Sequence, residues 1–178
     1  VEIKIIDQQG KNVPNGEIGE IATRSVKNIN EYWNLPEATK AAIDDNGWLR
    51  TGDAGYLDHD GYLYMHDRVK DMIISGGENV YPAEVEDAIY SHPHVEDVAV
   101  VGVPDEKWGE AIKAFVVVKE DTDVSADEII QFARTRIAKF KCPKSIDFID
   151  LLPRNMSGKI LRRELREPYW KDKDREVN

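Results

Sequence analysis

Residues 72–86 carry the clearest structural signal in the chain, and they read Met72-Ile73-Ile74-Ser75-Gly76-Gly77-Glu78-Asn79-Val80-Tyr81-Pro82-Ala83-Glu84-Val85-Glu86. Two short segments, Met72–Ile74 and Glu78–Val80, flank a Ser-Gly-Gly turn, which is typical of a tight β-hairpin. Proline suits the first turn of a helix because its missing N–H would have no partner there. We therefore predict a hairpin and then a helix from Pro82 to about Ser91, with two glutamates near its positive end.

Strand and helix patterns alternate after this helix, as they do in α+β domains. Runs of β-branched residues predict strands, and Ser125-Ala126-Asp127-Glu128 is a capping box that predicts the start of a helix. Apolar residues then recur at helical spacing as far as Ile137. The expected elements are strands at Val95–Val103, Ala111–Lys119 and Ser145–Ile149, and helices at 125–137 and Lys159–Glu167.

The residues before the hairpin are richer in strand patterns. The expected elements are strands at Val1–Asp7 and Glu17–Thr23, a short helix at Pro36–Ile43, and a hairpin of Gly55–Asp58 with Gly61–Met65. The sequence thus predicts an α+β fold. Residues 1–67 would be the β-rich end of a larger N-terminal domain, 68–71 a hinge, 72–170 a small α+β domain, and 171–178 a charged tail. The first residue is Val1 rather than Met, which predicts that the chain starts within a longer protein.

The composition is that of an ordinary globular protein, with 41% hydrophobic and 33% charged residues. No apolar run approaches the roughly 20 residues that span a bilayer, and the first residues lack the order of a signal peptide. The single cysteine, Cys142, excludes an internal disulfide and fits a reducing cytoplasm. The net charge of −10 argues against general nucleic-acid binding.

The charge is unevenly distributed along the 178 residues. The segment Lys139–Arg166 holds eight basic and three acidic residues, a net charge of +5, which leaves −15 on the remainder. Such a segment is either a solvated basic face or a surface that meets a polyphosphate.

Two segments within residues 1–68 could recognise a sugar. Gly47-Trp48-Leu49-Arg50-Thr51-Gly52-Asp53 places an aspartate after a glycine on a strand-edge turn, and the following hairpin returns to Arg68. Such an aspartate can accept hydrogen bonds from two vicinal ribose hydroxyls, and a nearby arginine can donate to the sugar or to a phosphate. The alternative is a plain turn.

Within residues 72–170, two glycines and a lysine are candidate site residues. Gly76 and Gly77 would let the backbone approach a ligand closely, although a plain hairpin would need them too. Lys159 follows Ser157-Gly158 on a loop just before a helix, where it presents a mobile cation. The loop lacks the earlier glycine and the preceding strand of a phosphate-binding P-loop, which leaves a single lysine reaching into a site.

Three other features carry less chemistry. His92 and His94 have no cysteine nearby and are interpreted as part of a helix-end turn rather than a metal site. Cys142 has no evident base partner and is interpreted as a small core residue. Trp108-Gly109-Glu110 is interpreted either as structural or as part of a moving interface.

Together these motifs resemble, over nearly the whole chain, the C-terminal motifs of the adenylate-forming (ANL) superfamily of acyl-CoA synthetases, luciferases and peptide-synthetase adenylation domains. Further matching segments are Tyr32–Thr39, Val101–Asp105, Trp108–Glu110 and Lys139–Pro143. Ile73–Pro82 and Ser157–Arg163 are more similar to fatty-acyl and aryl-acyl CoA synthetases than to peptide-synthetase domains. Glu31 departs from the pattern, because most relatives carry glycine there.

The resemblance implies an AMP-forming acid–thiol ligase that uses a fatty or aryl carboxylic acid, ATP with Mg²⁺, and CoA. The carboxylate attacks the α-phosphate of ATP to give an acyl-adenylate and pyrophosphate, and the CoA thiol then displaces AMP. Lys159 matches the adenylation lysine, Asp53 the ribose-binding aspartate, and Arg68 an arginine that helps to hold the nucleotide. Lys70 matches the hinge residue, and the Gly76–Gly77 hairpin would line the pantetheine tunnel after the domain rotates.

The resemblance also implies a partner, namely the N-terminal AMP-binding domain of the same enzyme. Residues 1–178 contain no phosphate loop, acyl pocket or metal-binding glutamate of the kind that this domain supplies, so the chain alone should not complete the reaction. We expect a cytoplasmic location. Nucleic acid is not an expected partner and no transmembrane segment is expected, whereas peripheral contact with a membrane is compatible with the sequence. Two alternatives stay open: an adenylation domain that loads a carrier protein, and an isolated, non-catalytic interaction module.

Overall fold

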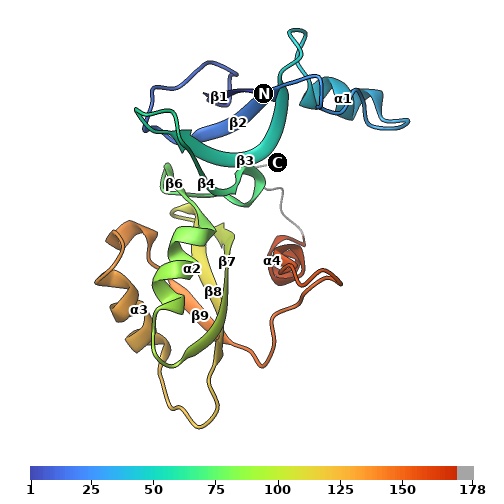
Figure 1. Cartoon of the computed structure of the whole chain (residues 1–178). Coiled ribbons are helices and arrows are strands. Elements are labelled where there is room, and N and C mark those ends of the chain that lie inside the picture. Colours follow the sequence, from blue (N-terminus) through green and yellow to red (C-terminus); the bar gives the residue numbers. More distant parts are fainter. Residues whose placement is uncertain (172–178) are drawn as a thin grey trace. The chain divides into compact units, whose positions relative to one another are not determined.

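The computed structural model describes residues 1–171 and divides the chain after Val69 into two compact units (Figure 1). Each unit is built on its own sheet, with few helices, so the predicted α+β class is confirmed. The predicted charged tail lies outside the described residues, apart from Lys171. No helix within residues 1–171 is both long and apolar enough to cross a membrane.

The first unit is a four-stranded antiparallel sheet in the order β1-β2-β3-β4. Its elements are β1 (Glu2–Ile6), β2 (Gly19–Arg24), α1 (Pro36–Ala42), β3 (Leu49–Leu57) and β4 (Leu63–Arg68). The strands and the short helix predicted from the sequence are present, with Pro36 in the first turn of α1.

The prediction was wrong about the surroundings of Asp53, which lies within β3 rather than on a turn. Gly52 has a φ of +73°, and the ladder between β2 and β3 is irregular at this point. Side chains replace the missing ladder bonds, because Thr51 Oγ1 donates to Ile21 O at 2.7 Å and Glu20 Oε1 accepts from Gly52 N at 3.1 Å. These bonds keep the segment extended through a glycine that would otherwise favour a turn.

The second unit contains a five-stranded sheet in which four strands follow one another in the order β6-β5-β8-β7. The fifth strand, β9, lies outside this order and pairs with β8 in parallel. The boundary between the units falls within the 3₁₀ turn η1 (Val69–Asp71). The elements that follow are β5 (Ile73–Ser75), β6 (Glu78–Val80), α2 (Pro82–Tyr90), β7 (Val95–Asp105), β8 (Gly109–Val118), α3 (Ala126–Arg134), η2 (Lys139–Lys141), β9 (Ser145–Phe148) and α4 (Arg162–Trp170). The predicted hairpin of β5 with β6, the helix after Pro82 and the capping box at Ser125 are confirmed.

The boundaries of two helices differ from the prediction. Helix α3 ends at Arg134 instead of Ile137, and α4 spans Arg162–Trp170 instead of Lys159–Glu167. The later start of α4 arises because Gly158 has a φ of +81° and the segment before α4 closes into a loop through a bridge between Arg154 and Ile160. Lys159 therefore lies on a loop just before the helix, as expected from its place after Ser157-Gly158.

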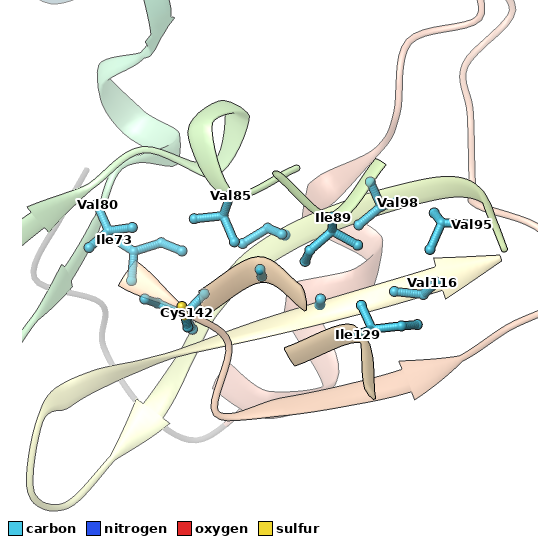
Figure 2. Packing of buried hydrophobic residues seen from close by; sticks show 13 residues of the cluster. Ile73, Val80, Val85, Ile89, Val95, Val98, Val116, Ile129 and Cys142 are labelled. Carbon is cyan, nitrogen blue, oxygen red and sulfur yellow. The ribbon is translucent and has the colours of Figure 1, made fainter. Parts of the chain in front are cut away.

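The strand β7 separates two hydrophobic clusters, because its alternate residues point to opposite faces of the sheet. On one face, Val98 and Val100 join a core beneath α2 and α3 (Figure 2). On the other face, Ala99 and Val101 join a smaller cluster that includes Leu152 and is covered by α4. Figure 1 shows α2 and α3 on one side of β7 and β8 and α4 on the other.

Cys142 is a core residue, as the sequence predicted, and only 2% of it is exposed. Its side chain lies in the larger cluster (Figure 2), and burial raises the pKa of its thiol. Both observations describe a packed thiol rather than a nucleophile.

The surroundings of His92 predict that the stability of the second unit depends on pH. Its ring packs edge-on against Phe132 with centroids 4.6 Å apart, and burial lowers the pKa of the imidazole, helped by the nearby His94 and Arg136 and opposed by Glu128. Because the folded state prefers the neutral ring, the contribution of His92 to stability is fully present above the usual histidine pKa of about 6.5. This contribution is lost as the pH falls through the lower pKa of the folded state. We expect the melting temperature to fall between pH 7.5 and 5.5, as measured by circular dichroism.

Two variants distinguish this contribution from general acid effects. His92→Leu should reduce the difference in melting temperature between the two pH values, since it removes the group that titrates. His59→Gln, at an exposed position of the first unit, should leave that difference unchanged. An identical pH dependence in wild type and His92→Leu would contradict the assignment.

Candidate functional site

The predicted site residues fall in both units of the chain. Asp53 and Arg68 belong to the first unit, whereas Gly76, Gly77 and Lys159 belong to the second. Lys70 is the first residue of the second unit and lies in η1.

Asp53 and Arg68 face each other across neighbouring strands. They are register partners on β3 and β4, and Arg68 Nη1 lies 2.9 Å from Asp53 Oδ1. The side chains are 27% and 52% exposed, so a ligand could reach both. The pair offers a carboxylate that accepts hydrogen bonds beside a guanidinium that donates them, which suits a sugar next to a phosphate. The structure brings these two predicted residues together.

The two glycines of the β5–β6 hairpin differ in their surroundings. Gly76 has a φ of +62°, and a Cβ there would lie 2.7 Å from Trp108 Cε3. Gly77 has a φ of +85°, but a Cβ there would meet no atom within 4 Å. Gly76 is therefore required by the packing of Trp108, whereas Gly77 needs glycine only for its backbone conformation and borders open space.

Trp108 organises this end of the second unit. Its carbonyl accepts a hydrogen bond from Gly76 N at 2.8 Å, which holds the hairpin. The ammonium groups of Lys107 and Lys144 lie 4.7 Å and 5.2 Å from ring centroids of its indole. The sequence leaves a structural and an interface role open for Trp108, and it gives no sign of the two lysines around the ring.

Lys159 is exposed on a loop that closes on itself. The loop runs from Pro153 to Leu161, where Leu161 N donates to Pro153 O at 2.8 Å. Asn155 Oδ1 accepts from Ser157 N at 3.0 Å and from Lys159 N at 2.9 Å, as in an Asx turn. The cation therefore projects from an ordered backbone, and Asn155 is a residue that sequence reasoning missed.

The basic segment Lys139–Arg166 is partly neutralised within the second unit. Among residues 1–171, four of its eight cations approach carboxylates: Lys141 and Glu84 at 2.7 Å, Arg154 and Asp97 at 2.7 Å, Arg162 and Glu86 at 2.6 Å, and Arg166 and Asp71 at 4.0 Å. Arg154, Arg162 and Arg166 tie α4 and its preceding loop to the rest of the unit, whereas Lys141 ties η2 to α2. The polyphosphate interpretation therefore rests on the other four.

The described residues contain no cluster of metal-ligating side chains. Within residues 1–171, no group of three or more His, Cys, Asp or Glu side chains is arranged to hold an ion. His92 packs edge-on against Phe132.

Comparison with known proteins gives consistent matches along the chain. The family model for the AMP-binding enzyme C-terminal domain matches residues 84–159. "Fatty acid--[acyl-carrier-protein] ligase ScoC" of Streptomyces coeruleorubidus is 48% identical over 178 residues, which are 100% of this chain and 34% of that protein. "Long-chain-fatty-acid--CoA ligase FadD13" of Mycobacterium tuberculosis is 55% identical over 151 residues, which are 85% of this chain and 30% of that protein.

Solved structures show the same similarity in three dimensions. ATP-bound MatB from Rhodopseudomonas palustris matches with a TM-score of 0.89 and 39% identity, over 96% of this chain and 34% of that one. The o-succinylbenzoate CoA synthetase MenE from Bacillus subtilis, in complex with its acyl-adenylate intermediate, matches with a TM-score of 0.85 and 45% identity, over 92% of this chain and 33% of that one. The chain thus spans about a third of the length of the relatives that it matches.

Proposed function

The chain belongs to the AMP-binding enzyme family, and from this membership we propose that it provides the C-terminal domain of an AMP-forming acid–thiol ligase. The observation that carries the proposal is Lys159, an exposed cation on an ordered loop at the end of the matched family segment. A mobile side chain on a fixed backbone suits a group that must enter a site formed with another domain.

Lys159 serves the first half-reaction, in which a carboxylate attacks the α-phosphate of ATP. Two anions approach each other in this step, and negative charge accumulates on the phosphate oxygens. The ammonium of Lys159 offsets this charge and holds the two reactants together, an interaction that is stronger in the transition state than in the ground state.

Asp53 and Arg68 hold the nucleotide during this step. The Asp53 carboxylate accepts hydrogen bonds from the ribose hydroxyls, and Arg68 orients that carboxylate through their contact at 2.9 Å. The pair thus positions the sugar while leaving the phosphates to other groups.

The second half-reaction transfers the acyl group to a thiol. The chain changes units at Lys70, and rotation there removes Lys159 from the reacting centre and brings in the β5–β6 hairpin. The open space at Gly77 then borders the path of the pantetheine arm, where a side chain would narrow the channel. ATP and CoA are therefore the proposed substrates beside the acid. The proposed location of the enzyme is the cytoplasm, whose reducing conditions fit a chain with a single cysteine.

The acceptor and the acid have two supported classes each. FadD13 is named for CoA and ScoC for an acyl-carrier protein, so the relatives themselves divide on the acceptor. The sequence of Ser157–Arg163 favours CoA as the acceptor, because it is more similar to acyl-CoA synthetases than to peptide-synthetase domains. The relatives are named for fatty acids, ferulate and 2-succinylbenzoate, which supports a fatty or an aryl acid as substrate.

A pyrophosphate-release assay on the complete enzyme tests the proposal. We expect release that depends on both ATP and an acid from a panel of short, medium, long-chain and aryl acids, followed by acyl transfer to CoA in preference to a pantetheinylated carrier protein. Residues 1–178 alone are the control and should release no pyrophosphate. Absence of acid-dependent release across the panel would reject the function, whereas transfer to the carrier protein alone would establish the second class of acceptor.

A further inference from the structure

Arg154 joins the loop of Lys159 to the sheet of the second unit. Its Nη1 donates to Gly158 O at 2.6 Å, and its Nη2 donates to Asp97 Oδ2 at 2.7 Å. One guanidinium therefore spans a backbone carbonyl of the loop and a carboxylate of β7, which a planar fork of donors can do and a single ammonium cannot do equally well.

Asp97 is itself fixed on the strand. The pairing of β7 with β8 is irregular between Val95 and Asp97, and such a bulge re-aims the side chain that follows it. Asp97 Oδ1 accepts from Val98 N at 3.0 Å, which leaves Oδ2 directed at Arg154. The carboxylate is thus an oriented anchor.

The contact with Gly158 acts directly on the catalytic lysine. Gly158 O belongs to the peptide unit whose N–H is that of Lys159, and a peptide unit is planar and rigid. Arg154 holds the oxygen of this unit, while Asn155 Oδ1 accepts from its N–H at 2.9 Å. The peptide that leads into Lys159 is therefore held at both ends.

The hydrogen bond from Arg154 matters because the backbone of Gly158 has more conformational freedom than that of the other residues of the loop. Its φ of +81° is in a region that glycine enters easily and leaves easily, so the direction of the next residue depends on outside contacts. The ends of the loop are fixed independently, since Leu152 is buried and Ile160 packs against the same cluster. Loss of the Arg154 contact should therefore loosen the tip without unfolding the unit.

We propose that Arg154, anchored by Asp97, is a positioning residue for Lys159 in adenylate formation. This inference rests on the proposed function, because it assigns the purpose of the contact to that reaction. The pair is 41% and 28% exposed, and an exposed ion pair contributes little to global stability. Its value is geometric, since a small misplacement of a charged group in a transition state is costly in rate.

The test combines the 178-residue chain with the complete enzyme. In the chain, Arg154→Met should speed hydrogen exchange at the amides of Gly158 and Lys159, measured by NMR, while the amide of Val100 in β7 stays protected. In the enzyme, Arg154→Met should slow adenylate formation by about tenfold with little change in KM for ATP or acid. Thioester formation from supplied acyl-adenylate should stay unchanged.

Further variants separate positioning from general damage. Asp97→Ala should show a smaller loss of the same kind, Asp97→Asn should recover most of the rate, and Arg154→Met/Asp97→Ala should be no slower than Arg154→Met, since both residues act through one contact. Arg24→Met removes a comparable exposed pair with Glu2 in the first unit and should change neither measurement.

The outcomes distinguish this inference from the proposed function. Unchanged exchange at Gly158 and Lys159 would overturn the contact as an organiser of the loop. Faster exchange with an unchanged adenylation rate would overturn positioning. If the wild-type enzyme formed no adenylate, the proposed function and the assigned purpose would both fail, while the exchange data would still decide whether Arg154 orders the loop.

Discussion

Replacing Lys159 by alanine in the complete enzyme is expected to slow adenylate formation by about 10²–10³-fold, the usual effect of losing one electrostatic contact to a transition state. The loss should appear in kcat, because the ammonium is needed where a carboxylate and a phosphate meet. Thioester formation from a supplied acyl-adenylate should be affected far less, since that step has no such meeting of anions. Pyrophosphate exchange and single-turnover thioester assays measure the two steps separately.

A cation far from this loop in sequence provides the control for this prediction. Lys27→Ala removes an exposed charge in the first unit, outside the segment Lys139–Arg166, and should leave both half-reactions close to wild type. Equal losses in the two half-reactions for Lys159→Ala would contradict the assignment of Lys159 to adenylation.

The fold was largely predictable because its signals are local. The hairpin before Pro82, the capping box at Ser125 and the β-branched strands each depend on residues that are close in sequence. The segment before Asp53 was not predictable in the same way, because a glycine such as Gly52 is typical of a turn, whereas it lies within β3. Its strand is maintained by hydrogen bonds to Glu20 and Ile21 on a neighbouring strand, about 30 residues away.

The candidate site was predictable only in part, for the same reason. Lys159, Asp53 and Arg68 belong to motifs that can be recognised in the sequence, and the structure adds that Asp53 and Arg68 are paired. The contact of Arg154 with Asp97 spans 57 residues, and an arginine in a basic segment gives no sign of the carboxylate that it will meet. Burial and pairing of this kind are set by tertiary packing, so they appear only with the fold.

The hairpin glycines show a further limit of sequence reasoning. Two adjacent glycines look equivalent, yet Gly76 lies against the Trp108 ring and Gly77 does not. A substitution at Gly76 would displace the indole, so its effect would mix packing with function. Gly77 is the position at which a role in catalysis can be tested separately.

Gly77→Leu in the complete enzyme is expected to slow thioester formation by about 10²-fold while adenylate formation stays within a few-fold of wild type. The new side chain would enter open space in the second unit and narrow the proposed channel, so raising the CoA concentration should restore part of the rate. The backbone strain of a non-glycine residue at positive φ is about 1–3 kcal/mol, which should lower the melting temperature without unfolding the protein.

Two comparisons identify the cause of that loss. Gly16→Leu carries the same strain, because Gly16 has a φ of +89° and open space around it, and it should leave thioester formation unchanged. Lys70→Pro fixes φ and removes a backbone donor in η1, where the chain passes between its units, so thioester formation should fall without rescue by CoA. A locked pivot cannot be restored by mass action, whereas a narrowed channel can. An unchanged thioester step in folded Gly77→Leu enzyme would remove Gly77 from the channel and reduce it to a turn residue.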